Sequence, residues 1–224
     1  MKKLLGLLTA VLISASLLNA EDKKEEAKGL SGGVSIFYDS SADFRGKTAN
    51  EEINASIGVN KEIFGLDFGL EGTVGVRDGL EDERRLNLYT SLDLSFLDLE
   101  VGVVNYNNNI VVGDDTEIYV EAGAEIILNP TVTVYYSPDR EVTTLEGGIS
   151  QDISIKKLNL EASANVGTTE MADERVNYYK FAVSTTYEIN KDTHAFVGVD
   201  FVNFDEIALD DFDIGVYTGI SYRF

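Results

Sequence analysis

The sequence predicts an all-β fold: a transmembrane, up-and-down, antiparallel β-barrel of 12 strands, with 10 strands as the alternative. Three observations lead to this expectation. Apolar and polar residues alternate along most of the chain, short and long polar connectors alternate between those stretches, and the chain stops inside an alternating run. Strict alternation gives a strand one apolar and one polar face. Such strands close into a barrel whose outer face meets lipid.

Residues 1–20 have the pattern of a secretory signal peptide. Lys2 and Lys3 form a positive segment, residues 4–18 are uncharged and mostly apolar, and Ala20 offers a small residue for cleavage. The apolar stretch is shorter than the ~20 residues of a spanning helix. We therefore expect an exported protein whose signal peptide is cleaved after Ala20.

Residues 21–30 mix both charge signs without an apolar pattern, which is typical of a flexible lead, here a periplasmic one. The barrel is expected to occupy residues 31–224. Each of its alternating segments is near the ~9–11 residues that cross a bilayer at a tilt. The predicted strands are residues 31–40, 51–60, 65–77, 85–96, 98–106, 116–127, 130–137, 143–155, 158–168, 177–189, 193–202 and 212–224.

Each predicted strand carries apolar residues at every second position. The segment 85–96 is among the clearest and 143–155 is the weakest. In chain order the residues expected to point outward include Val34 and Ile36; Ile53 and Ile57; Leu66 and Leu70; Leu86 and Leu88; Val101 and Val103; Ile118 and Val120; Val132 and Val134; Leu145 and Ile149; Leu160 and Val166; Phe181 and Val183; Val197 and Val199; Ile214 and Ile220. A soluble β-sandwich or lipocalin-like barrel is the alternative, but the polar faces are too rich in carboxylates to form a core.

The connectors are predicted to alternate in length, as the short periplasmic turns and longer outer loops of outer-membrane barrels do. Tight turns are expected at 60–64, 97–98, 128–130, 156–157 and 190–192, and longer links at 41–50, 78–84, 107–115, 138–142, 169–176 and 203–211. The links carry arginines that could meet lipopolysaccharide phosphates or could be ordinary solvated charges. These arginines are Arg45, Arg84, Arg85, Arg140 and Arg175.

The last residues carry Tyr217, Gly219, Tyr222 and Phe224 at a characteristic spacing. This spacing resembles the C-terminal assembly signal of bacterial outer-membrane β-barrels. The resemblance implies residence in the outer membrane among its lipids and lipopolysaccharide. It also implies periplasmic chaperones and the barrel-assembly machinery as partners during insertion.

A second resemblance lies in the middle of the chain. The stretch from Leu128 to Tyr136, followed by Leu145 to Gly148, is similar to the middle hairpins of small porins of Gram-negative bacteria, such as the TorF-like group. The resemblance implies passive diffusion of small solutes. A non-conducting structural or surface-interaction barrel, adhesin-like in character, is the alternative.

Composition excludes several other functions. The formal net charge of −21 argues against nucleic acid as a partner, and without cysteine the chain has no disulfide or thiolate site. The single histidine, His194, follows a tight turn on the periplasmic side, where no serine stands out as its partner. We therefore expect no enzymatic activity, catalytic residue, cofactor or metal site.

The inward face predicted from parity is strongly acidic. Its acids are Asp39, Asp67, Glu71, Asp93, Glu100, Glu117, Glu121, Glu125, Glu146, Glu161, Glu188, Asp200 and Asp213, and its bases are Arg77, Lys180 and Arg223. All these acids except Asp39 and Asp213 are expected to line a pore. Acidic rings favour cations, so a cation preference is expected. Its strongest contributors should be Glu71, Glu117, Glu121, Glu125 and Glu161.

Overall fold

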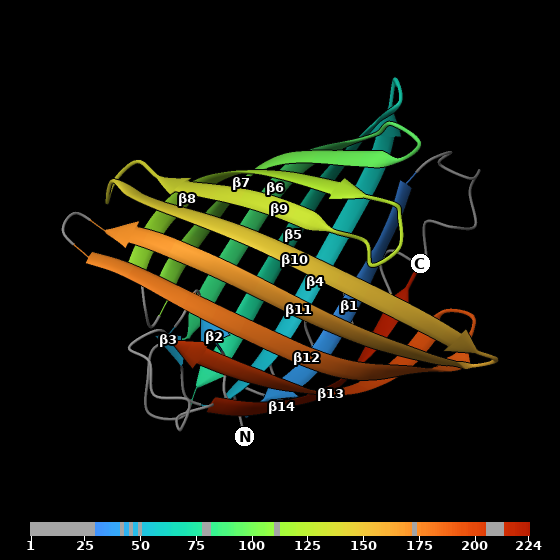
Figure 1. Ribbon diagram of the computed structural model, residues 1–224. Helices are drawn as coiled ribbons and strands as arrows, with labels where there is room; N and C mark the ends of the chain where they lie inside the picture. Colours follow the sequence, from blue (N-terminus) through green and yellow to red (C-terminus); the bar gives the residue numbers. More distant parts are fainter. Residues whose placement is uncertain are drawn as a thin grey trace.

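A computed structural model describes residues 30–40, 43–44, 47–48, 51–77, 82–109, 113–171, 174–204 and 213–224. Twelve strands form one closed antiparallel barrel, in which strands that follow one another in the sequence also lie side by side (Figure 1). The prediction of a 12-stranded up-and-down barrel is confirmed. None of the described residues forms a helix that is long and apolar enough to cross a membrane.

The barrel strands are β1 (Leu30–Asp39), β4 (Glu52–Ile63), β5 (Leu66–Arg77), β6 (Glu83–Asp93), β7 (Leu97–Asn109), β8 (Gly113–Ala124), β9 (Thr131–Ser137), β10 (Val142–Ile155), β11 (Leu158–Met171), β12 (Glu174–Asn190), β13 (Thr193–Phe204) and β14 (Asp213–Arg223). Two short strands, β2 (Asp43–Phe44) and β3 (Lys47–Thr48), pair separately within the first long link. The segment 143–155, the weakest of the predicted strands, belongs to the well-paired β10.

The barrel closes where β1 pairs with β14. Val34 faces Tyr222 in this register, and beyond the ladder the backbones of Gly32 and Phe224 exchange hydrogen bonds of 3.1 and 3.0 Å. The Phe224 ring lies against Gly32, where an added Cβ would sit only 2.6 Å from the ring. The added Cβ would also lie 2.6 Å from the Gly58 backbone oxygen, so a larger residue at position 32 would crowd both the ring and the neighbouring strand.

Tight turns join β4 to β5, β6 to β7, β8 to β9, β10 to β11 and β12 to β13, and we call this the turn end of the barrel. Phe64 and Gly65 both have positive φ (56° and 79°), which is the conformation of a two-residue type I′ hairpin turn. We call the opposite end the loop end. Its longest connectors join β1 to β4 and β13 to β14, whereas three residues separate β7 from β8 and two separate β11 from β12.

Four predictions about connectors were wrong. The turn expected at 60–64 lies at 64–65, because β4 continues to Ile63 and the chain reverses through the positive φ of Phe64 and Gly65. The turn expected at 97–98 lies at 94–96, because Ser95 adopts a φ of 71° and its amide donates to Asp93 Oδ1 over 2.7 Å. The links expected at 107–115 and 169–176 are largely strand. Asn108, with a φ of 57°, lets the β7–β8 ladder resume as far as Asn109 and Gly113 after a register shift.

The predicted signal peptide (1–20) and nearly all of the predicted charged lead (21–30) lie outside the described residues, as does Arg45.

Candidate functional site: the inward face of the barrel

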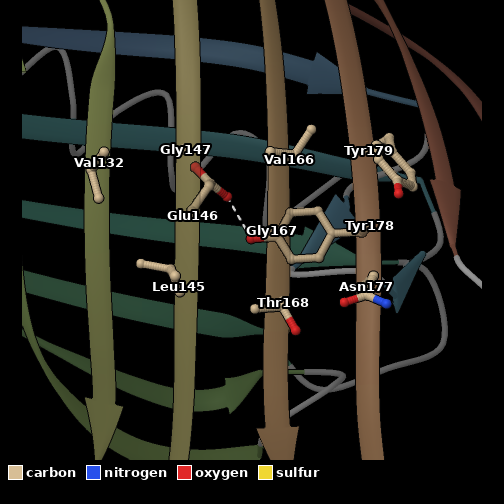
Figure 2. A pocket seen from close by; sticks show the side chains of 10 residues that line it. All are labelled: Val132, Leu145, Glu146, Gly147, Val166, Gly167, Thr168, Asn177, Tyr178 and Tyr179. Atoms are coloured by element: carbon tan, nitrogen blue, oxygen red, sulfur yellow. Dashed lines mark hydrogen bonds between the residues drawn. The ribbon is translucent and has the colours of Figure 1, made fainter.

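Tyrosines that cross one strand to reach the next identify the inward face. Tyr119 on β8 donates to Glu100 Oε1 on β7 (2.6 Å) and accepts from Asn87 on β6 (3.2 Å). Tyr178 on β12 passes over Gly167 on β11 and donates to Glu146 Oε2 on β10 (2.5 Å; Figure 2). A side chain reaches its second-neighbour strand most readily on the concave side of a curved sheet, where side chains converge.

Four tyrosines share this arrangement, each lying over a glycine of the adjacent strand. In addition to Tyr119 over Gly102 and Tyr178 over Gly167, Tyr89 covers Gly69 and donates to Asn60 (2.8 Å). Tyr217 covers Gly198 and reaches Ser184. A Cβ at any of these glycines would collide with the ring, so the missing side chain is what lets the ring lie flat across the strand.

The strand register identifies the inward residues of every strand, because directly opposed residues in antiparallel strands share a face. Ten of the predicted pore-lining residues fall on it: Asp67, Glu71, Asp93, Glu100, Glu117, Glu121, Glu146, Glu161, Glu188 and Asp200. Glu125 does not, because β8 ends at Ala124 and Glu125 lies exposed in the turn. Of the predicted assembly signal, Tyr217 and Gly219 face inward, whereas Tyr222 pairs with outward Val34.

The register also brings in acids that the sequence analysis left out: Glu52, Glu62, Glu83, Asp98, Asp115 and Asp152, together with the base Arg85. Most of them lie near the ends of the predicted strands or in the predicted connectors. Extending the alternation of inward and outward positions from the centre of each strand into its connectors would have found them.

The inward charges are unevenly distributed among the described residues. We call strands β4–β8 the acidic wall. It has 11 acids and two bases: Glu52, Glu62, Asp67, Glu71, Glu83, Asp93, Asp98, Glu100, Asp115, Glu117 and Glu121, with Arg77 and Arg85. Strands β9–β14 and β1 are the mixed wall. It has seven acids and two bases: Asp39, Glu146, Asp152, Glu161, Glu188, Asp200 and Asp213, with Lys180 and Arg223.

Each wall contains one base held by carboxylates. Arg77, whose side chain is only 3% exposed, contacts Glu83 and lies 3.5 Å from Glu52. In the mixed wall, Lys180 Nζ lies 3.1 Å from Asp200 Oδ2. These two bases therefore already have carboxylate partners.

Several acids directly oppose one another across a ladder. Glu100 on β7 faces Glu121 on β8, and the described groups that donate to this pair are uncharged: Tyr119 donates to Glu100, and Thr133 donates to Glu121 (2.8 Å). Glu62 with Asp67, Asp93 with Asp98, and Asp152 with Glu161 repeat this opposition. Like charges directly opposite each other are destabilising unless water or mobile cations screen them.

Part of the acidic wall is packed rather than open. Val104, Tyr106 and Tyr119 are buried as one cluster on β7 and β8, and Tyr135 of β9 packs against it. The rings of Tyr119 and Tyr135 lie 5.8 Å apart. Glu117, beside this cluster, is only 2% exposed. On this wall, aromatic side chains as well as carboxylates therefore project toward the lumen.

His194 lies on the inward face between Glu188 and Ser221, which oppose it on the two neighbouring strands. Ser221 was not among the predicted site residues, because it lies on the last strand and only the strand register places it opposite His194. The described residues offer no hydrogen bond to His194 Nδ1, which is buried. No group of three or more potential metal ligands occurs among the described residues either.

Comparisons with known proteins give likeness of structure only. No protein-family model matches the chain, and no curated protein matches it in sequence. The KdgM porin matches with a TM-score of 0.56 and 14% identity over 86% of this chain and 99% of its own. The NanC porin matches with 0.57 and 10% over 84% and 98%. An outer membrane channel from Pseudomonas putida F1 matches with 0.53 and 12% over 89% and 97%. At these identities the likeness shows the barrel fold.

Proposed function

We propose that the chain forms an outer-membrane barrel through which small solutes diffuse passively, with a preference for cations. The outward face supports residence in a membrane, because its large apolar side chains are open to the surroundings. Leu88, Phe181 and Val183 are more than half exposed. Exposed apolar surface on this scale is favourable against lipid and unfavourable against water. The two structural neighbours named as porins support the same function.

The observation that carries the cation preference is the excess of inward acids over inward bases, concentrated on the acidic wall. Glu71, Glu100 and Glu121 are only partly buried, so they are open to luminal water. Carboxylates that line a narrow aqueous passage attract cations and repel anions. Lumens filled with protein instead need balanced charges, because unpaired buried carboxylates are costly.

Reversal potentials in planar bilayers test this proposal. Purified barrel inserted between two KCl solutions of unequal concentration should conduct with a reversal potential of the sign that indicates K⁺ over Cl⁻. Raising the salt from about 0.1 to 1 M should reduce the preference, because the Debye length falls from about 10 Å to 3 Å. An anion preference would contradict the proposed lumen.

The second candidate is a barrel that does not conduct and acts through its loops. The buried cluster of Val104, Tyr106 and Tyr119 favours it, because these side chains occupy luminal space. Folded barrel shows a mobility shift between boiled and unboiled gel samples, since a closed barrel has its backbone groups paired. Shifted protein without any conductance would support this second function.

We also propose that residues 1–20 are removed on export and that Phe224 serves in assembly. The Phe224 backbone closes the β1–β14 seam with Gly32, so its loss affects both recognition and closure. The mature protein should begin at Glu21 by mass spectrometry. Phe224→Ser should lower the amount of assembled barrel in the outer membrane, and a normal yield would contradict the assembly role.

A further inference from the structure

The outer face of the barrel carries a depression of about 420 Å³ over strands β9–β12. Gly147 lies at its floor, and Val132, Leu145, Val166 and Tyr179 are among the residues around it (Figure 2). These five residues have the parity of the outward face. The volume lies within the range of small-molecule sites, about 300–1,000 Å³.

The depression exists because one outward position lacks a side chain. Gly147 faces Val132 on one side and Val166 on the other in the strand register. A Cβ added to Gly147 would meet only Thr131 O, at 3.9 Å. Backbone crowding therefore does not require glycine here, and the notch is open to an occupant from outside the barrel.

One end of the depression is polar and cationic. Thr168 and Asn177 oppose each other there, on the side toward the loop end. The exposed Arg175 donates from Nε to Thr168 Oγ1 over 2.9 Å, which holds the guanidinium at the rim. Its Nη donors make no other described contact. Glu170 faces Arg175 across the ladder, but no ion pair joins them among the described contacts.

We propose that this depression binds a phosphate-bearing lipid of the outer leaflet, with an acyl chain over Gly147 and the phosphate at Arg175. The arrangement matches such a lipid in polarity, because an apolar notch leads to an arginine with free donors. Arginine binds phosphate bidentately, and burying acyl-chain methylenes in the notch is favourable. The site rests on the proposed residence in the membrane but not on conduction.

Two pairs of variants test the site with matched controls. Gly147→Leu fills the notch. Gly72→Leu adds the same side chain at another outward glycine, which lies between Ile57 and Leu86 and has no atom within 4 Å of an added Cβ. Arg175→Gln removes the rim charge, whereas Arg84→Gln removes an exposed outward arginine that faces Val74.

The measurement is native mass spectrometry of folded barrel in neutral detergent with added lipid A, compared with dioleoylglycerol as an uncharged two-chain lipid. Wild-type barrel should retain one lipid A and prefer it over dioleoylglycerol. Arg175→Gln should weaken retention about tenfold, which is the loss of one charge-assisted bond of about 1.4 kcal/mol. Gly147→Leu should abolish retention, and both control variants should match wild type. Glu170→Gln should tighten binding, because it removes the opposing charge.

Equal retention by Arg175→Gln and Arg84→Gln, or equal affinity for the two lipids, would overturn the lipid site. Dimers that disappear in Gly147→Leu would also overturn it, because the notch would then receive a second copy of the chain. Conductance is recorded on the same preparations. A conducting barrel without lipid preference overturns this inference alone, and a lipid-binding barrel without conductance overturns the proposed channel alone.

Discussion

The acidic wall and the mixed wall are both built from antiparallel strands, but their inward faces carry different side chains. The acidic wall combines 11 carboxylates with a buried aromatic cluster. The mixed wall spreads seven carboxylates over seven strands and has small, uncharged side chains such as Ser163, Ala182 and Ser184 at other inward positions. Antiparallel pairing uses backbone hydrogen bonds, so the side chains at the inward positions can vary in their chemistry. Function can therefore be concentrated on one side of a barrel whose backbone is nearly uniform.

The largest expected effect concerns the ion pair of each wall. Arg77→Gln should lower the free energy of unfolding by about 3–5 kcal/mol, because it leaves Glu52 and Glu83 near each other without their cation. Lys180→Gln should cost about 1.5–3 kcal/mol, since Lys180 is 29% exposed and water weakens its ion pair with Asp200. Urea unfolding of the detergent-folded barrels checks the difference, with Arg77→Lys as the charge-retaining control. Equal losses would mean that the two pairs are equivalent.

Neutralising glutamates on one wall or the other should change the ion selectivity to different extents. The triple variant Glu71→Gln, Glu100→Gln and Glu121→Gln neutralises three residues of the acidic wall. We expect the cation-to-anion permeability ratio to fall about threefold, since cations concentrate within a Debye length of about 8 Å from this wall.

The matched variant neutralises Glu146, Glu161 and Glu188 of the mixed wall, and we expect a smaller change in the same ratio. Glutamine retains an acceptor, so Tyr119 and Tyr178 keep their hydrogen bonds in both variants. Reversal potentials at one KCl gradient provide the comparison. A greater effect from the mixed-wall variant would show that the acidic wall is not the path of the ions.

The smallest expected effect compares two tyrosine hydroxyls. Tyr119→Phe should lower the free energy of unfolding by about 1–2 kcal/mol, because the hydroxyl serves both Glu100 and Asn87. Tyr178→Phe should cost about 1 kcal/mol, because it removes the hydroxyl group that donates to Glu146. Urea unfolding under one condition measures both variants. If Tyr178→Phe cost more, the crossing tyrosine of the mixed wall would be the stronger support.

The barrel and its strand parity could be predicted from the sequence because outward positions such as Leu86 and Leu88 repeat with period two. Strand ends could not, since they depend on local backbone choices. Ser95 turns the chain through a positive φ, and Asn108 allows a ladder to resume within a predicted loop. Glu125 was misplaced for the same reason, because strand β8 ends one residue before it.

The arrangement within the lumen was beyond the sequence, because it depends on neighbours that are distant in the chain. Alternation places Arg77 inward, but only the register places Glu52 and Glu83 beside it. Likewise, the alternation gives no sign that Tyr106 and Tyr119 pack into one buried cluster. Parity predicts which way a side chain points, and packing decides whether water reaches it.

The four tyrosines that cross glycines also determine how the barrel can deform. They link β4 to β6 and β6 to β8 on one side, and β10 to β12 and β12 to β14 on the other. Each set ties five strands into a stiff panel, and none of these four tyrosines crosses β9 or β1. Strand β9 is also the shortest in the barrel, at seven residues. We therefore expect the cross-section of the barrel to change between round and oval mainly by bending at β9 and β1, which lie between the two sets of cross-linked strands.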